Sequence, residues 1–149
     1  MLNISNFGLF SENSKVRLFN NTNLCLSCIE PDIDILIYEK NLNLINKSVK
    51  GIIKYIVNDC FLINNYFTTT SNQILYDENF NLILIKNLKV GMYIKYIDEN
   101  NKIINKKIEC IDEFNNINEI FYGLILDEYY SFFIDNFMVI NSIKIEDKC

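Results

Sequence analysis

The hydrophobic residues of this chain fall in short runs and do not follow the spacing of an amphipathic helix. The runs are rich in Ile, Val, Tyr and Phe, which favour strands because branched and aromatic side chains pack well on a pleated sheet. Clusters of Asn, Asp, Glu and Lys separate the runs. The pattern predicts one all-β domain of many short strands, at Val16–Phe19, Ile33–Tyr38, Leu42–Ile45, Gly51–Val57, Phe61–Phe67, Ile74–Tyr76, Leu82–Ile85, Met92–Ile97, Lys102–Ile111, Phe121–Leu126, Phe132–Ile134 and Val139–Ile145.

Polar clusters between these runs predict the turns. The clusters Asp98–Asn101 and Asn115–Asn116 flank alternating segments and are typical of hairpin turns, because Asn and Asp tolerate positive φ. Two stretches, Ile85–Val90 and Asp112–Ile120, are compatible with short helices. The polar residues 1–24 are expected to form a first hairpin or a loosely attached leader. No internal repeat is visible in the sequence.

Composition narrows the functions that this chain can have. With 149 residues, half of them apolar, the chain is long enough for one domain with its own core. The formal charge of −5 disfavours binding to nucleic acid or to anionic lipid. The chain contains no histidine, which excludes any mechanism that relies on its own imidazole. Asn, Ile and Lys are abundant, as codon bias in an A+T-rich genome would produce, so a single Asn carries little weight.

Five cysteines are scattered through the chain, at Cys25, Cys28, Cys60, Cys110 and Cys149. Their spacing indicates neither a disulfide framework nor a four-cysteine zinc site, and we expect no metal and no cofactor. The residues at the N-terminus do not resemble a signal peptide, and the apolar run Phe132–Ile140 is too short to span a bilayer. We therefore expect an intracellular, cytoplasmic protein that is not bound to a membrane.

Four local patterns follow one another in an order that suggests a function. The first is Cys28 followed, after a short turn, by an apolar strand. The second is the segment Phe67–Tyr76, with three threonines at the end of a strand, and the third is Leu88-Lys89-Val90-Gly91. The fourth comprises Phe121–Leu126 and then an apolar tail that ends in Ile140-Asn141-Ser142.

These patterns resemble the Hint superfamily, the fold of inteins, bacterial intein-like domains and the Hedgehog autoprocessing domain. Members begin with a nucleophilic Cys before a strand and carry a Thr-x-x-His motif and a Leu-x-Val-Gly-Asp step. They end in His-Asn followed by Ser, Thr or Cys. The resemblance implies a horseshoe-shaped Hint-like domain at residues 28–142, with residues 1–27 as an N-terminal flank or first hairpin and residues 143–149 as a C-terminal flank.

The resemblance assigns a role to each matching residue. Cys28 matches the first nucleophile, and Thr70 matches the Thr of Thr-x-x-His. Gln73 stands at the position of that His, and Ile140 stands where the His before the terminal Asn is expected. Asn141 matches the terminal Asn and Ser142 the downstream nucleophile. Both imidazole positions are therefore substituted.

In the family chemistry, Cys28 would attack the carbonyl of Ser27 and form a thioester, and Asn141 would then cyclise and cut the Asn141–Ser142 bond. The substrate would be the chain's own flanking segments. Because an amide such as Gln73 has no useful pKa, losing the acid–base group costs roughly 10²–10⁴ in rate. The sequence thus predicts slow or degenerate self-cleavage or splicing.

Other interpretations of the same residues stay open. The domain is alternatively a catalytically inactive Hint relic that acts as a structural or protein-binding module, or an unrelated small β-barrel whose motif matches are coincidental. The pair Cys25 and Cys28 is alternatively a redox pair or half of a zinc site. A redox pair is expected in a strand–helix setting, whereas the sequence predicts that a strand follows Cys28.

Overall fold

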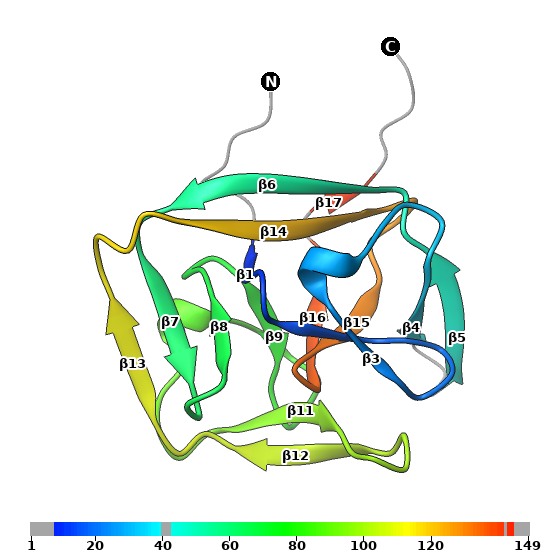
Figure 1. Ribbon diagram of the computed structural model, residues 1–149. Coiled ribbons are helices and arrows are strands. Elements are labelled where there is room, and N and C mark those ends of the chain that lie inside the picture. The colour runs from blue at the N-terminus through cyan, green and yellow to red at the C-terminus, as the bar shows by residue number, and fades with distance from the viewer. Residues whose placement is uncertain (1–7, 40–42, 142, 145–149) are drawn as a thin grey trace.

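The computed structural model describes residues 8–39, 43–141 and 143–144, with side chains as far as Asn141. This part of the chain is built from short strands and two 3₁₀ turns (Figure 1). The strands are β1 (Phe10–Ser11), β2 (Lys15–Arg17), β3 (Asn23–Cys25), β4 (Asp34–Glu39), β5 (Asn43–Ser48), β6 (Gly51–Val57), β7 (Cys60–Ile63), β8 (Phe67–Thr69), β9 (Ile74–Tyr76), β10 (Leu82–Leu84), β11 (Tyr93–Ile97), β12 (Ile103–Lys107), β13 (Ile111–Phe114), β14 (Glu119–Leu126), β15 (Ser131–Ile134), β16 (Phe137–Ile140) and β17 (Ile143–Lys144), and the turns are η2 (Leu26–Cys28) and η3 (Ile85–Asn87).

The strands form two sheets. The first has the order β13-β7-β8-β1-β14-β17, with β6 also paired to β14. The second has the order β10-β9-β16-β15-β2-β3, with the hairpins β4–β5 and β11–β12 joined to it through β15 and β16. Figure 1 shows β6 and β14 across the top of the molecule and β11 and β12 across the bottom, with β9, β15 and β16 between them. The all-β domain that the sequence predicts is therefore confirmed.

The core lies where the two sheets meet. Phe10, Phe67, Phe132 and Phe137 are almost completely buried and contact one another through their rings. These residues come from β1, β8, β15 and β16, so the main hydrophobic cluster joins the beginning of the chain to its end. Burying such large apolar side chains supplies most of the stability that a domain of this size has.

The structure contains an internal repeat that is not visible in the sequence. A shift of 59 positions, from Lys15 to Ile74, places β2 on β9, β3 on β10 and η2 on η3. The hydrogen bonds repeat as well: the N–H of Leu26 donates to the carbonyl of Ser14, and the N–H of Ile85 donates to the carbonyl of Gln73. The repeat is not visible in the sequence because the copies share backbone geometry and apolar spacing but few identical residues.

The hairpin β15–β16 joins the two copies of the repeat. Val16 in β2 pairs with Ile134 in β15, and Leu75 in β9 pairs with Val139 in β16. All four side chains are fully buried. Each copy therefore pairs with one strand of the same hairpin, which joins both copies in the second sheet.

Arg17, the single arginine of the chain, ties three turns together. Its guanidinium donates to the side-chain oxygens of Asn21, Asn101 and Asn136, which lie in the turns β2–β3, β11–β12 and β15–β16. All three Asn residues have positive φ, which Asn tolerates better than most residues. Arg17 itself is buried.

The structure corrects several expectations about local elements. Asn115 and Asn116 do not form a hairpin turn, because β13 pairs with β7 while β14 pairs with β6 and β1. The helix considered at Asp112–Ile120 is instead β13 and the start of β14, and the one at Ile85–Val90 is only the 3₁₀ turn η3. The turn at Asp98–Asn101 does join a hairpin, β11–β12.

The first strands belong to the body of the domain. β1 lies between β8 and β14, and β2 forms a hairpin with β3 and pairs with β15. Of the two expectations for residues 1–24, the structure shows the first hairpin, β2–β3, which belongs to the body of the domain. At the other end, β17 adds a parallel strand to β14. In the described residues, we find no helix with the length and apolar character needed to cross a membrane.

Candidate functional site

The threonines at the end of β8 hold the peptide bonds on both sides of Leu9. Phe10 pairs with Thr69, which brings Leu9 opposite Thr70. The N–H of Leu9 donates to Thr70 Oγ1 at 3.1 Å, and Thr69 Oγ1 donates to the carbonyl oxygen of Leu9 at 2.7 Å. Thr70 Oγ1 in turn donates to Asn72 Oδ1 at 2.9 Å. The peptide bond between Gly8 and Leu9 is therefore the one that the Thr70 hydroxyl contacts.

Gln73 connects this peptide bond to the end of β16. Its side chain is buried, with 1% of its surface exposed. Gln73 Nε2 donates to the carbonyl of Ile140 at 3.1 Å and to that of Ile74 at 3.0 Å. Gly8 packs directly against the Gln73 carboxamide, so closely that a Cβ atom at Gly8 would overlap Gln73 Oε1. Gln73 thus lies between Gly8 and the residue that precedes Asn141.

Asn141 is buried next to this cluster, and hydrogen bonds to the backbone hold its carboxamide. The N–H of Tyr130 donates to Asn141 Oδ1 at 2.7 Å, and Asn141 Nδ2 donates to the carbonyl of Glu128 at 3.0 Å. The backbone N–H of Asn141 donates to the carbonyl of Tyr130 at 3.3 Å. These bonds fix the side chain in the loop between β14 and β15. The structure thus brings Thr70, Gln73 and Asn141 together with Gly8 and Leu9. Ser142 lies outside the described residues.

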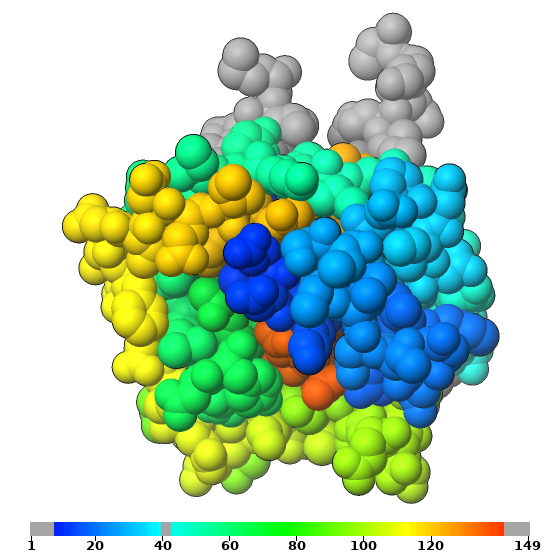
Figure 2. Space-filling view, in the orientation of Figure 1, coloured from blue at the N-terminus to red at the C-terminus, as the bar shows by residue number. Residues whose placement is uncertain are grey.

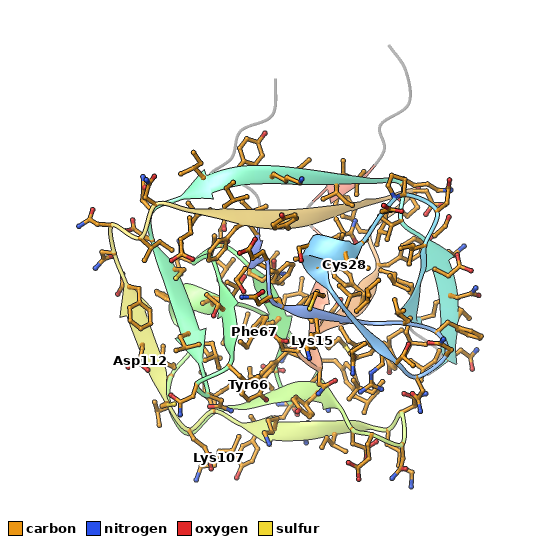
Figure 3. The ribbon with its side chains drawn as sticks, viewed as in Figure 1. Lys15, Cys28, Tyr66, Phe67, Lys107 and Asp112 are labelled. Carbon is orange, nitrogen blue, oxygen red and sulfur yellow. The ribbon has the colours of Figure 1, made fainter. Side chains whose placement is uncertain are left out.

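Cys28 is not part of this cluster. It is the last residue of η2, where its side chain is exposed (Figure 3). The N–H of the preceding Ser27 donates to the carbonyl of Glu12 at 3.2 Å. Glu12 follows β1, whereas Leu9 precedes it. η2 and Cys28 therefore lie at the end of β1 that is opposite to the Leu9–Thr70 contact.

The repeat explains why the sequence pattern pointed to Cys28. The segment from Leu24 to Ile35 is the first copy of the segment from Ile83 to Ile94, which contains the Val-Gly step. Asp32, with a φ of 75°, occupies the position of Gly91, with a φ of 97°. A Cys followed by a turn and a strand is therefore part of the repeated unit, and Cys28 has the same position in it as Asn87. Cys28 thus belongs to the repeated unit, whereas the residue whose N–H meets the Thr70 hydroxyl is Leu9.

Sequence reasoning missed Gly8 and Leu9. Leu9 is the residue whose N–H meets the Thr70 hydroxyl, and its side chain is buried with 1% of its surface exposed. It carries no thiol or hydroxyl. The sequence carries no signal for this position, because Leu9 has no chemical feature that marks a site; the pairing of β1 with the Thr-rich strand β8 places it there.

The hydrogen bonds of the cluster join neutral hydroxyl and amide groups. Neither kind of group exchanges protons readily near neutral pH, so Thr70, Gln73 and Asn141 can orient a peptide bond but cannot serve as an efficient general acid or base. Among the described residues there is no group of three or more Cys, Asp or Glu side chains arranged to hold a metal ion.

Comparison with solved structures identifies the fold. A variant of the Ssp DnaB mini-intein superimposes with a TM-score of 0.76 at 17% identity, over 99% of this chain and 100% of that one. The bacterial intein-like domain from Clostridium thermocellum gives 0.73 at 13% identity, over 89% and 97%, and the TvoVMA intein gives 0.76 at 16%, over 89% and 96%. No protein-family model and no curated protein matches the sequence. The chain has the intein-like Hint fold, as the sequence motifs predicted.

Proposed function

We propose that this chain is a degenerate Hint domain that no longer forms a thioester and serves as a structural or protein-binding module. The observation that carries the proposal is the contact between the Thr70 hydroxyl and the N–H of Leu9. In the chemistry that the Hint resemblance implies, the residue that supplies this N–H also supplies the attacking thiol. Here that residue is a leucine, which has no atom able to attack the carbonyl of Gly8.

The residues around this peptide bond support the proposal further. A departing amide nitrogen must be protonated, and an imidazole does this in the family. Gln73 at that position is a hydrogen-bond donor to the carbonyls of Ile74 and Ile140, and it has no proton to give at neutral pH. The nucleophile and the acid–base group are therefore replaced at the same peptide bond.

The contacts of Asn141 argue against an efficient second step. Cyclisation requires Asn141 Nδ2 to attack the carbonyl carbon of Asn141 itself. That nitrogen donates to the carbonyl of Glu128, while Oδ1 accepts from Tyr130, so the carboxamide must break both bonds before it can turn. Breaking a buried hydrogen bond costs about 1–3 kcal/mol, which slows the reaction and does not abolish it. We therefore expect cleavage at Asn141–Ser142 to be slow.

The competing hypothesis is self-processing through Cys28, with a thioester at Ser27, capture by Ser142 and cyclisation of Asn141. The exposure of Cys28 is the observation in its favour, since an exposed thiol can react with added reagents. Self-processing through Cys28 predicts a chain that has lost residues 1–27, whereas the degenerate domain predicts that the N-terminal residues stay attached.

Intact mass spectrometry of the purified protein, incubated with and without dithiothreitol or hydroxylamine, distinguishes them. We expect no nucleophile-dependent loss of N-terminal residues, in the native protein or in a Cys28→Ala control. Loss of residues 1–27 that requires Cys28 and is accelerated by either reagent would overturn the proposal. Loss of residues 142–149 that is fast and requires Asn141 would show that the C-terminal reaction is still efficient.

A further inference from the structure

The pair of cysteines in Cys25-Leu26-Ser27-Cys28 has no role in the cluster around Leu9. Cys25 is the last residue of β3 and immediately precedes η2, and Cys28 is the last residue of η2. The turn η2 therefore follows Cys25, and the strand that the sequence predicts after Cys28 is β4, which begins at Asp34 after a short turn. Both thiols are free, Cys25 is partly exposed and Cys28 is exposed. In Figure 2 the blue segment that contains β3 and η2 lies on the front face of the molecule.

The turn sets the distance between the two cysteines. A 3₁₀ helix makes one turn in three residues and rises about 2 Å per residue, so positions three apart lie above one another, about 6 Å apart at Cα. Disulfides form between residues whose Cα atoms are about 4.4–6.8 Å apart. The backbone of η2 therefore suits a bond between Cys25 and Cys28 with little rearrangement.

Hydrogen bonds hold this turn in place. The N–H of Leu26 donates to the carbonyl of Ser14 at 2.7 Å, and the N–H of Ser27 donates to the carbonyl of Glu12 at 3.2 Å. Leu26 between the two cysteines is fully buried. The two bonds and the buried side chain fix the middle of the turn, while the cysteines at its ends reach solvent. A reagent can therefore reach the thiols without local unfolding.

The second copy of the repeat shows that the fold does not require sulfur here. η3 has almost the same backbone: the residue before the turn has φ −58° and ψ 140° in η2, and φ −79° and ψ 145° in η3. Leu84 and Asn87 occupy the positions of Cys25 and Cys28 there. Since nearly the same turn forms with a leucine and an asparagine, the fold does not require the two thiols for packing.

Cys60 is a contrasting case in the same chain. It is buried with 5% of its surface exposed, in the small cluster with Leu9 and Phe121. Burial, together with the charges of Glu119 and Asp59, raises the pKa of the Cys60 thiol. A thiol with a raised pKa gives little thiolate at neutral pH, so Cys60 is expected to be inert.

We infer that Cys25 and Cys28 form a thiol–disulfide exchange site that accepts low-molecular-weight disulfides or an exposed disulfide of another protein. The Cys28 thiolate attacks one sulfur of the substrate disulfide, which releases the first thiol and leaves a mixed disulfide on Cys28. The Cys25 thiolate then attacks Cys28 Sγ, which releases the second thiol and leaves the Cys25–Cys28 disulfide. Two electrons pass from the protein dithiol to the substrate, and the two protons of the dithiol end on the released thiols.

Glutathione disulfide is the probe for the test. In the full chain carrying Cys60→Ser, Cys110→Ser and Cys149→Ser, we expect release of two glutathiones per protein and no lasting adduct. With Cys25→Ser added, a glutathione adduct on Cys28 should persist at least roughly ten-fold longer, because no neighbouring thiol resolves it. With Cys28→Ser added instead, reaction should be slow, since the more exposed thiol is missing.

Two further measurements show which cysteines form the disulfide and whether the variants are folded. Peptide mapping of the unmodified protein after oxidation should find the Cys25–Cys28 bond, and circular dichroism should show that every variant keeps its strand signal. An adduct that is as long-lived in the presence of Cys25 as in its absence would overturn the inference. So would a disulfide that maps to a different pair of cysteines in the unmodified protein.

Discussion

The N–H of Leu9 and the hydroxyl of Thr70 are joined by a 3.1 Å hydrogen bond although 61 positions separate them in the sequence. This bond, together with the one from Thr69 Oγ1 to the carbonyl of Leu9, presents the Gly8–Leu9 peptide bond to Gln73. The arrangement resembles the setting in which a Hint domain would activate a peptide bond, with an aliphatic side chain in place of the nucleophile. The proposed function can therefore be tested directly, by introducing a thiol at position 9 and an imidazole at position 73.

Restoring both missing groups should restore cleavage at Gly8–Leu9. In the double variant Leu9→Cys and Gln73→His, a thiol stands beside the carbonyl of Gly8 and an imidazole beside the amide nitrogen. We expect dithiothreitol to release residues 1–8, which intact mass spectrometry would detect. The single variant Leu9→Cys should react roughly 10²–10⁴-fold more slowly, the usual contribution of a general acid–base group.

The matched control for this experiment is Leu9→Ala with Gln73→His, which provides the imidazole without the thiol and should stay intact. A double variant that folds and remains uncleaved after prolonged incubation would show that Gly8–Leu9 is not the equivalent of the family's scissile bond. Adding Cys28→Ser should leave cleavage of the double variant unchanged.

A methyl group at Gly8 should destabilise the domain. The Cβ atom of alanine would overlap Gln73 Oε1 and lie 2.9 Å from the backbone Cα of Gln73, so the side chain cannot relieve the clash alone. We expect Gly8→Ala to lower the free energy of unfolding by about 1–3 kcal/mol, the usual cost of overpacking. Urea denaturation would measure it. Gly51→Ala is the control, because its nearest contact is the flexible end of Ile125 at 3.3 Å; equal losses at the two glycines would contradict the prediction.

Replacing Arg17 should loosen three turns at once. Lysine keeps the charge but cannot reach Asn21, Asn101 and Asn136 together, because its donors sit on one nitrogen. We expect Arg17→Lys to lower the free energy of unfolding by about 1–3 kcal/mol, since Arg17 is buried and the partly buried Asn101 and Asn136 lose their donor. Thermal or urea unfolding would show this. Lys102→Met, which removes an exposed charge from the β11–β12 hairpin, should change stability little, and a comparable loss there would contradict a role for the network.

Asp135 should make the domain less stable as the pH rises through about 4 to 6. Burial raises the pKa of Asp135 to about 6. The hydrogen bonds from the Lys15 N–H and the Ser14 hydroxyl, and the charge of Lys15, lower this pKa but do not outweigh the effect of burial. Asp135 Oδ2 is buried without a hydrogen-bond partner. Between the unfolded and folded pKa values the folded protein binds more protons at this group than the unfolded chain, so the free energy of unfolding falls as the pH rises.

The variant Asp135→Asn should remove this pH dependence. Asparagine can still accept the N–H of Lys15, which lies 3.0 Å from Asp135 Oδ1. Its advantage over the native protein should be largest above about pH 7, at about 1–2 kcal/mol after allowance for partial solvent access, and should shrink toward about pH 3. Urea unfolding over this pH range would measure it; an advantage that does not change with pH would contradict the assignment.

The strands were predictable because they depend on local composition. Runs such as Gly51–Val57 and Phe132–Ile134 combine branched and aromatic residues, and they form β6 and most of β15. The turn at Asp98–Asn101 was equally local, since Asp98 Oδ1 accepts from the N–H groups of Asn100 and Lys102. Asn115 and Asn116 look the same in sequence, but the strands on either side pair with β7 and β6. Partner choice between strands is not encoded in a turn alone.

The site was predictable only in part, for a related reason. Thr70, Gln73 and Asn141 could be named as candidates because they lie at fixed places relative to strands that the sequence reveals, and the structure brings these three residues close together. Leu9 was missed because the sequence motif depends on a chemical feature, a cysteine before a strand, which Leu9 does not have. The pairing of β1 with β8 is what places the N–H of Leu9 against the Thr70 hydroxyl. A repeat with diverged residues added to the error, because it provided a second segment of suitable shape around Cys28.

The shared hairpin β15–β16 has a consequence for how this protein is made. β2 and β9 are synthesised early, but each must wait for its partner strand until the ribosome has translated residues 131–140. Until then both halves of the nascent chain expose unpaired strand edges, which are prone to pair wrongly. Final closure of the domain thus requires that residues 131–140 have been synthesised. A pause or truncation before Ser131 should therefore leave a chain that aggregates or is degraded.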